Sequence, residues 1–238
     1  MRRNFACVLR DAERNVVLDF LEKRDMATLK AYFAKKGVAL CQQIEVVVSD
    51  MWDGYVNLVG AKGIFPNAIN VIDRFHFVQH ISTSLDGQRK LVRKEFASDE
   101  RLKNLRWPLL KSPHSLNPDE QLQLKVAFEV SPTLGLIYAL RTKLKAIFDT
   151  DCSKEAGLLA LTSWEEEAAK VESKPLGKFL ITVKNWKDKV CNFFTDRLTN
   201  GGMEGTNNHI RGLIRRAFGY VDFQALRLRV LTECGSTP

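Results

Sequence analysis

The segment Thr199-Asn-Gly-Gly-Met-Glu-Gly-Thr-Asn-Asn-His-Ile-Arg-Gly-Leu-Ile-Arg-Arg216 combines a chain turn with an amphipathic helix. Its Asn-Gly-Gly start predicts a turn, and the spacing beyond it predicts a helix. One helix face gathers a carboxylate, amides and guanidinium groups, from Glu204, Asn207 or Asn208, Arg211 and Arg215. Apolar side chains, those of Ile210, Leu213 and Ile214, lie on the other side. The polar face suits a metal ion and a phosphodiester, but a solvated basic helix with a capping turn has the same pattern.

The composition is that of a soluble globular protein with a polyanionic partner. The 238 residues are 45% hydrophobic and carry a formal net charge of +8. This length allows one large core, with room for an inserted subdomain. The sequence has neither an apolar run of about 20 residues nor a signal peptide, so we expect a cytoplasmic, nucleoid-associated protein and no membrane partner. Five scattered cysteines predict reduced core thiols and argue against a zinc site.

The first 75 residues predict a mixed α/β sheet. A β-hairpin opens the chain and a helix that Gly37 ends comes next. Short apolar runs then predict strands buried on both faces, each followed by Asp. In order, the expected elements are the strands Phe5–Leu9 and Val16–Leu21, the helix Met26–Lys36, the strand Ile44–Val48, a helix over residues 51–61 and the strand Ala68–Ile72. Such a sheet has an antiparallel edge formed by the hairpin.

Residues 76–198 predict an all-helical insertion, and residues 199–238 return to the sheet domain. The expected helices of the middle region are Phe75–Phe96, Leu102–Trp107 closed by Pro108, a helix capped by Asp119 and Glu120 that ends at Val130, Thr133–Phe148 after Pro132, Glu155–Val171, and Leu176–Asp196. After the opening segment, residues 217–220 predict a turn. Asp222 then caps a last helix, Phe223–Cys234.

Two aspartates stand at strand ends, where ligands gather in open α/β sheets. Asp50 follows the strand Ile44–Val48, and it either holds a hard cation such as Mg²⁺ or caps the next helix. Asp73 follows the next strand, and parallel pairing would bring it within reach of Asp50. His76 lies one turn beyond Asp73. This pair either supports the site or forms a helix cap with a buried, hydrogen-bonded histidine.

These signals combine into ordered motifs that cover nearly all of the chain. They are Asp50-Met51-Trp52-x-x-Tyr55, Phe65-Pro66-Asn67-Ala68, Asp73-Arg74-Phe75-His76, and Asn200-Gly-x-x-Glu204-Gly-x-Asn207-Asn208-x-Ile210-Arg211 followed by Arg216 and Gly219-Tyr220. In this order the motifs resemble the catalytic region of bacterial insertion-sequence transposases of the ISL-three group. Those proteins are DDE transposases, which have an RNase H-like fold and three catalytic carboxylates.

The resemblance implies two catalytic and metal-binding residues. Asp50 would be the second catalytic Asp, after the fourth strand of the RNase H-like sheet, and Glu204 would be the catalytic Glu after the helical insertion. Together with a third carboxylate they would hold two Mg²⁺ or Mn²⁺ ions for DNA strand cleavage and transfer. Asp73 and His76 match a motif near the active site and would lie beside the metal ligands.

The resemblance also implies that a catalytic residue is missing. The first catalytic Asp belongs to the first strand of the sheet, upstream of the hairpin, and no Asp or Glu precedes Asp11 in this chain. We therefore expect a transposase truncated at the N-terminus, with the first strand of its sheet missing and its activity lost or impaired. The zinc-binding and helix-turn-helix segments of full-length relatives are also absent from the sequence.

Basic and amide side chains predict a DNA-binding surface that tracks phosphates without reading sequence. They are Asn207, Asn208, Arg211, Arg215 and Arg216 on the closing helix and Arg89, Lys90, Arg93 and Lys94 in the insertion. The expected partners are transposon ends and target DNA, with homo-oligomerisation of the full-length protein. The alternatives are a non-catalytic DNA-binding or regulatory fragment, a metal-dependent nuclease, and a structural α/β protein without DNA affinity.

Overall fold

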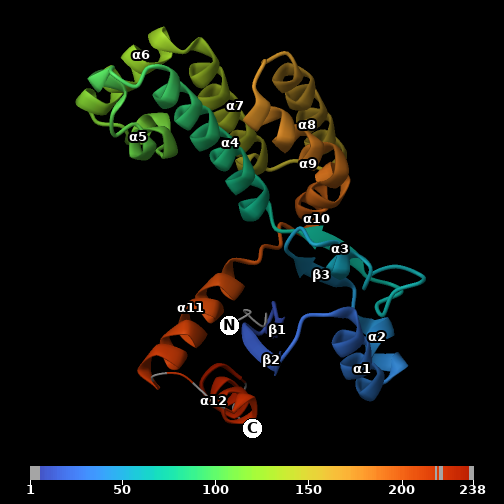
Figure 1. The fold of residues 1–238 in the computed structure, drawn as a ribbon. Coiled ribbons are helices and arrows are strands. Elements are labelled where there is room, and N and C mark those ends of the chain that lie inside the picture. Colours follow the sequence, from blue (N-terminus) through green and yellow to red (C-terminus); the bar gives the residue numbers. More distant parts are fainter. Residues whose placement is uncertain (1–5, 218, 220–221, 236–238) are drawn as a thin grey trace. The chain divides into compact units, whose positions relative to one another are not determined.

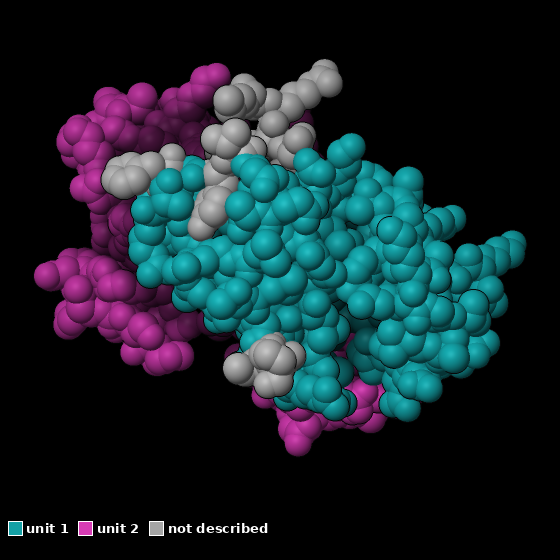
Figure 2. All heavy atoms as spheres, turned by 90° about the horizontal axis from the view of Figure 1, so that it is seen from below, with its two compact units in different colours: residues 1–70, 198–238 teal, residues 71–197 magenta. Residues whose placement is uncertain are grey.

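The structure is a computed structural model, and it describes residues 6–217, 219 and 222–235 (Figure 1). The predicted α/β class is confirmed, because these residues form helices and two small sheets. The chain divides into two compact units, coloured separately in Figure 2. Unit 1 comprises Met1–Asn70 and Leu198–Pro238, and unit 2 comprises Val71–Arg197.

The predicted hairpin is confirmed in unit 1, but its first strand covers Cys7–Asp11 instead of Phe5–Leu9, and Phe5 lies outside the described residues. Strands β1 (Cys7–Asp11) and β2 (Val16–Leu21) pair antiparallel. Asp11 Oδ1 closes the turn by accepting hydrogen bonds from the backbone N–H groups of Glu13 and Arg14, both at 2.9 Å. Polar residues in the turn thus satisfy its backbone groups locally.

Helix α1 (Met26–Lys36) has the predicted bounds. Asp25 caps its start by accepting from the Thr28 N–H at 2.8 Å, and Gly37 ends it with a φ of 91°. A side chain is strained at that φ, so glycine explains the helix end. A short helix that the sequence analysis did not predict, α2 (Val38–Gln43), follows directly. A core cluster that includes Leu29 of α1 and Cys41 of α2 also takes in Cys7 and Leu21 of the hairpin.

The segment between the two predicted buried strands differs from expectation. Strand β3 (Val46–Ser49) is only half-buried along its three valines, so burial on both faces was wrong for this strand. The predicted helix over residues 51–61 is wrong in length, since α3 covers only Asp53–Val56. The chain turns back instead: Gly60 has a φ of 94°, and the Phe65 N–H donates to Leu58 O at 2.8 Å. Strand β4 (Ile69–Ile72) follows as predicted and pairs with β3.

Strands β3 and β4 form a sheet of their own, separate from the hairpin. The backbone N–H of Ile69, at the start of β4, donates to Glu45 O just before β3. Pairing of the two starts indicates parallel strands, whose carboxyl ends then lie at the same edge. The single mixed sheet expected from the sequence is therefore not formed by the described strands, which give two sheets of two strands each.

The last two helices complete unit 1 from the other end of the sequence. Helices α11 (Gly201–Arg216) and α12 (Phe223–Cys234) place Ile210, Leu213 and Val230 in one core cluster with Val17 and Phe20 of β2. The predicted cap of α12 is confirmed, because Asp222 accepts from the backbone N–H groups of Gln224 and Ala225. The predicted turn at 217–220 includes Phe218 and Tyr220, which lie outside the described residues.

Unit 2 is helical apart from the end of β4. Its helices are α4 (Arg74–Glu95), α5 (Arg106–Leu110), α6 (Pro118–Val130), α7 (Pro132–Asp149), α8 (Lys154–Ala169), α9 (Lys174–Cys191) and α10 (Phe193–Asp196). Helix α4 packs against α7 and α9, and α8 packs against the same two helices. The shared core contains Phe77, Phe148, Trp164 and Phe179, all buried.

Three details of unit 2 correct the sequence analysis. Pro108 lies inside the first turn of α5 instead of closing a helix, and a proline is tolerated there because first-turn N–H groups lack helical partners. Asn117 caps α6, in a reciprocal pair of hydrogen bonds with Glu120, in place of the expected acidic cap. The helix expected over residues 176–196 is broken at Asn192 into α9 and α10.

All five cysteines are free thiols. Within the described part of the chain, no helix combines the length and apolarity needed to cross a membrane.

Candidate functional site

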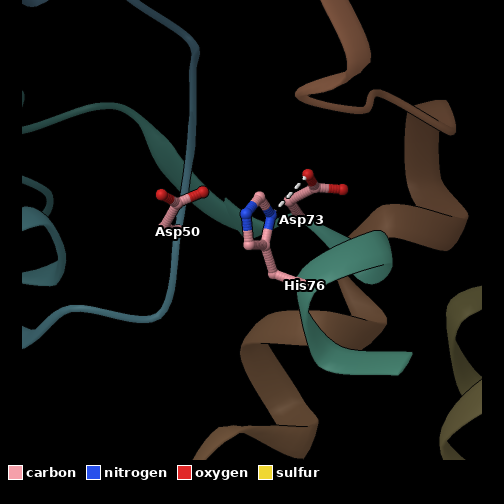
Figure 3. Close-up of side chains that lie close together, drawn as sticks. All are labelled: Asp50, Asp73 and His76. Carbon is pink, nitrogen blue, oxygen red and sulfur yellow. Dashed lines mark hydrogen bonds and ion pairs between the residues drawn. The ribbon is translucent and has the colours of Figure 1, made fainter. Parts of the chain in front are cut away.

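Asp73 is a buried carboxylate at the junction of β4 and α4. Its Oδ1 accepts a hydrogen bond from the Phe75 N–H at 3.0 Å and so caps α4. This cap is one of the two predicted interpretations of Asp73. Its Oδ2 lies 3.0 Å from His76 Nδ1 (Figure 3). Asp73 is 2% exposed, whereas the His76 side chain is 40% exposed. The cap and the supporting role are therefore compatible, because one oxygen of Asp73 caps the helix while the other fixes the imidazole through Nδ1.

Asp50 follows β3 and is exposed. It does not cap the next helix, because α3 begins at Asp53 with Trp52 at its N-cap. Asn200 Nδ2 donates to Asp50 Oδ1 at 3.3 Å across 150 residues of sequence. Asp50 is thereby joined to the residue directly before α11.

Asp50, Asp73 and His76 form a group with the composition of a metal site. One ligand atom from each lies within 4.8 Å of the others (Figure 3). Both aspartates stand at the carboxyl ends of paired strands, as the sequence predicted. Glu204 is not a member of this group.

Glu204 lies on the first turn of α11 and is exposed. The helix starts at Gly201, and Asn200 at its N-cap makes no capping hydrogen bond with its side chain. The Asn200 side chain donates a hydrogen bond to Asp50 instead, and this bond connects the start of α11 to the end of β3. Asn200 therefore connects the strand end that bears Asp50 to the start of the helix that bears Glu204.

The polar face predicted for α11 is resolved in detail. Asn208 is the exposed amide of this face, and its Oδ1 accepts from Arg211 Nη1 at 2.7 Å, while Asn207 is half-buried. Arg211 and Arg215 are exposed. The opposite face carries Ile210 and Leu213 into the core. Helix α11 therefore presents a continuous row of polar groups that begins at Glu204.

The side chain of Arg216 extends to α12, where Glu233 interacts with several cationic groups. Glu233 Oε2 lies 3.0 Å from His209 Nε2 and 3.3 Å from Arg216 Nη2, and Arg229 also pairs with Glu233. Desolvation opposes the ionisation of Glu233, but the hydrogen bonds from His209 and Arg229 and the nearby positive charges lower its pKa. The charge of Arg216 is thus partly balanced within the protein, whereas Arg211 and Arg215 form no ion pair with any residue that the structure describes.

Three of the four basic residues predicted on α4 have protein partners. Asp86 pairs with Arg89 Nη2 at 2.7 Å and with Lys90 Nζ at 2.8 Å. Arg93 donates to the backbone oxygens of Phe96 and Asp99. Lys94 is exposed on the last turn of the helix. Arg89, Lys90 and Arg93 thus interact with α4 itself and with the segment after its C-terminal end, so these basic groups already have partners within the protein.

The sequence model of a transposase family, the DDE transposases of the ISL-three group, matches residues 2–230 of the chain. The chain belongs to this family. The chain is 28% identical over 240 residues to the transposase of insertion sequence element IS1557 from Mycobacterium tuberculosis, a match that covers 90% of this chain and 53% of the relative. It is 26% identical over 231 residues to the transposase of IS1001 from Bordetella parapertussis, covering 95% and 56%.

The chain spans about half the length of the curated relatives that it matches. No solved structure matches it significantly.

The residues of the chain fit the divalent metal ion that its family implies. Asp50 and Glu204 offer exposed carboxylate oxygens, the ligand type that Mg²⁺ and Mn²⁺ prefer. The imidazole of His76, oriented by Asp73, has the hydrogen-bonded arrangement common to histidines at metal sites.

The sequence did not predict the role of two residues near this site. Asn200 was assigned only to a turn, and its contact with Asp50 joins segments 150 residues apart, which no local pattern reveals. Arg10 was not singled out, although its guanidinium lies against Gly202 at the start of α11. A single arginine in a strand carries no spacing signal that distinguishes it from a surface residue.

Proposed function

We propose that this chain supplies the metal-binding and DNA-binding face of a DDE transposase that cleaves and transfers DNA strands by phosphodiester displacement. Asp50 and Glu204 are the metal ligands. The observation that carries the proposal is the hydrogen bond from Asn200 to Asp50, because it joins the start of the helix that bears Glu204 to the strand end that bears Asp50. Two exposed carboxylates so connected, on a chain of this family, support phosphodiester chemistry above a structural role.

Each side chain has a distinct task in this proposal. Asp50 and Glu204 hold Mg²⁺ or Mn²⁺, and Asp73 orients His76 beside them. Bound metal would activate water or a 3′-hydroxyl group and stabilise the leaving oxygen. Arg211 and Arg215 neutralise DNA phosphates, and Asn208 hydrogen-bonds to phosphate or sugar oxygens.

The fold that we propose is an RNase H-like sheet interrupted by a helical insertion. The hairpin, the parallel pair of β3 and β4, and α11 after a helical unit support this assignment. Its boundaries are residues 1–75 for the sheet portion, 76–198 for the insertion and 199–238 for the closing helices.

The DNA partners in this proposal are transposon ends and target DNA. The net charge of +8 supports a polyanionic partner, and binding through phosphates would weaken steeply as salt is raised. Homo-oligomerisation belongs to the same proposal, because transposition joins two ends of one element.

Metal binding provides the first test. We expect Mn²⁺ to bind the purified chain, measured by titration calorimetry or electron paramagnetic resonance. Asp50→Asn and Glu204→Gln should each weaken this binding at least tenfold, because each removes a charged oxygen ligand. Glu166→Gln is the matched control, since Glu166 is an exposed glutamate on α8. Equal Mn²⁺ affinity in all four proteins would refute the assignment of Asp50 and Glu204 as ligands.

DNA binding and cleavage form the second test. The chain should bind a duplex that carries insertion-sequence ends at low salt, and Glu204→Gln should abolish any nicking of that duplex with Mg²⁺ or Mn²⁺. Nicking that persists unchanged in Glu204→Gln would refute the proposed site. A non-catalytic DNA-binding fragment would bind DNA equally after Asp50→Ala and Glu204→Ala and would bind no metal, and a nuclease would cut DNA without transposon ends.

A further inference from the structure

We infer that Arg10 is a DNA-phosphate-binding residue, held on the first turn of α11 beside the carboxylates of the candidate site. The inference rests on the proposed function and extends it to the hairpin. It arises from the close approach of the Arg10 guanidinium to Gly202, two residues before Glu204.

The hairpin directs Arg10 toward α11. Side chains alternate between the two faces of β1: Leu9 packs against the cluster around Leu29, and Val8 packs against the cluster that contains Ile210 of α11. The strand register shifts between Leu9 and Arg10, so that Leu9 pairs with Asp19 and Arg10 pairs with Val17. Such bulges redirect side chains and are common next to active sites.

Gly202 makes the approach of Arg10 possible. A Cβ atom at position 202 would overlap with the Arg10 atoms Cζ, Nη1 and Nη2. A glycine at this point therefore leaves room for a guanidinium directly against the helix backbone. Gly205, one turn later on the same helix, has no atom near its missing Cβ, so the space at residue 202 is specific to Arg10.

The electrostatics of this position favour an anion. Arg10 Nε is buried without a hydrogen-bond partner, and Arg10 forms no ion pair with another described residue. Its charge lies at the positive end of the α11 dipole, where a cation is unfavourable unless an anion is present. An arginine fork matches phosphate geometry and would form charge-assisted hydrogen bonds with it.

The location relative to the carboxylates identifies the anion as a phosphodiester. Glu204 is the acidic residue of the first turn of α11, and Asn200 connects the start of the same helix to Asp50. Metal-binding carboxylates and a free guanidinium at one helix start have the charge pattern that a metal-bound DNA phosphate requires. Arg10 is thus placed to bind the backbone of the strand that the site acts on.

The test measures the affinity of the full chain for a short DNA duplex as a function of salt. Arg10→Ala should lower the affinity about tenfold at low salt and reduce the salt slope by about 1, as expected for one lost phosphate contact. Arg10→Lys should recover part of the affinity, because it keeps the charge but loses the fork. Gly202→Ala should weaken binding as Arg10→Ala does, because the new methyl group displaces the guanidinium.

Gly205→Ala is the control for the glycine substitution, since it changes the same helix by the same group without a clash, and it should leave DNA affinity unchanged. The double variant Arg10→Ala with Gly202→Ala should be no weaker than Arg10→Ala alone, because both changes remove the same contact.

Two results would overturn the inference. If the wild-type chain binds DNA and the Arg10 variants bind it with the same affinity and salt slope, Arg10 does not contact phosphate, and the proposed function stands without it. If Arg10→Ala lowers thermal stability and Mn²⁺ affinity but leaves the salt slope unchanged, Arg10 only holds α11 in place. Failure of the wild-type chain to bind DNA at all would instead refute the proposed function itself.

Discussion

An ion pair between Asp19 and Arg227 connects the N-terminal and C-terminal segments of unit 1. Asp19 of β2 accepts from Arg227 of α12 through two parallel bonds, Nε to Oδ1 at 2.7 Å and Nη2 to Oδ2 at 2.9 Å. The Phe20 N–H also donates to Asp19 at 2.7 Å. Desolvation raises the pKa of this buried carboxyl, but the bonds from Arg227 and Phe20 and the charge of Arg227 outweigh it and lower the pKa overall.

We predict that Arg227→Met lowers the free energy of unfolding at neutral pH by about 2–3 kcal/mol, because it leaves a buried carboxylate without its charged donor. The wild-type pair stabilises the fold above the unfolded-state pKa of about 3.9, and this stabilisation is lost as the pH falls through the lower folded-state pKa. The difference between the two proteins should therefore shrink at about pH 3. Urea unfolding at both pH values measures it.

Arg229→Met is the control for this prediction, since Arg229 is 57% exposed in its pair with Glu233. Exposed pairs contribute about 1 kcal/mol or less, so its effect should be small. An Arg227→Met protein as stable as wild type at neutral pH would show that the buried pair contributes nothing.

Side-chain contacts divide into those that the sequence predicts and those that it does not. Asp73 and His76 are three residues apart, so helical spacing alone predicts their contact. The bonds of Asn200 to Asp50 and of Arg227 to Asp19 connect residues that are 150 and 208 positions apart. Only the tertiary fold brings such residues together, and no local pattern encodes it.

Elements were predicted well where capping residues and apolar periodicity agree. The bounds of α1, between Asp25 and Gly37, and of α12, after Asp222, follow from their caps. The segment around α3 was misjudged because apolar residues such as Leu58 fit a helical spacing, whereas their backbone bonds close a turn around Gly60. Tertiary pairing of Leu58 with Phe65 outweighs the weak helix signal there.

For α11, we predict that its two faces separate stability from DNA binding. Leu213 is 3% exposed in the core shared with β2 and α12, so Leu213→Ala should lower the free energy of unfolding by about 2–4 kcal/mol. Arg211→Ala should change stability by less than about 0.5 kcal/mol but reduce the salt slope of DNA binding by about 1. Chemical unfolding and DNA titration of both variants are the measurements. Equal effects of the two substitutions on DNA affinity would contradict this division.

At the scale of the whole molecule, each unit has a core of its own. Unit 2 is centred on aromatic side chains, and Phe148 is fully buried against the rings of Phe77, Phe193 and Phe194. Unit 1 has the clusters around Leu29 and around Val17 and Val230. Separate cores favour separate unfolding, since multidomain chains often depart from a single two-state transition.

We predict that Phe148→Ala destabilises unit 2 by about 3–5 kcal/mol and leaves unit 1 protected. In hydrogen exchange measured by mass spectrometry, amides of α4, α7 and α9 should exchange faster, whereas those of the hairpin and α12 should not. Phe20→Ala is the reciprocal variant, because Phe20 stacks on Phe223 with ring centroids 5.3 Å apart. It should increase exchange in the hairpin and α12 alone. Uniform acceleration across the chain in either variant would indicate one cooperative unit.

The division of unit 1 between the two ends of the sequence has a consequence for synthesis on the ribosome. Val17 and Phe20 are synthesised long before the partners that cover them, Ile210, Leu213 and Val230. At about 5–20 residues per second, the hairpin waits on the order of ten seconds or longer with this apolar face uncovered. Unit 2 is one continuous segment and can fold during that interval. The N-terminal hairpin is therefore the part of the nascent chain that most needs a holding chaperone.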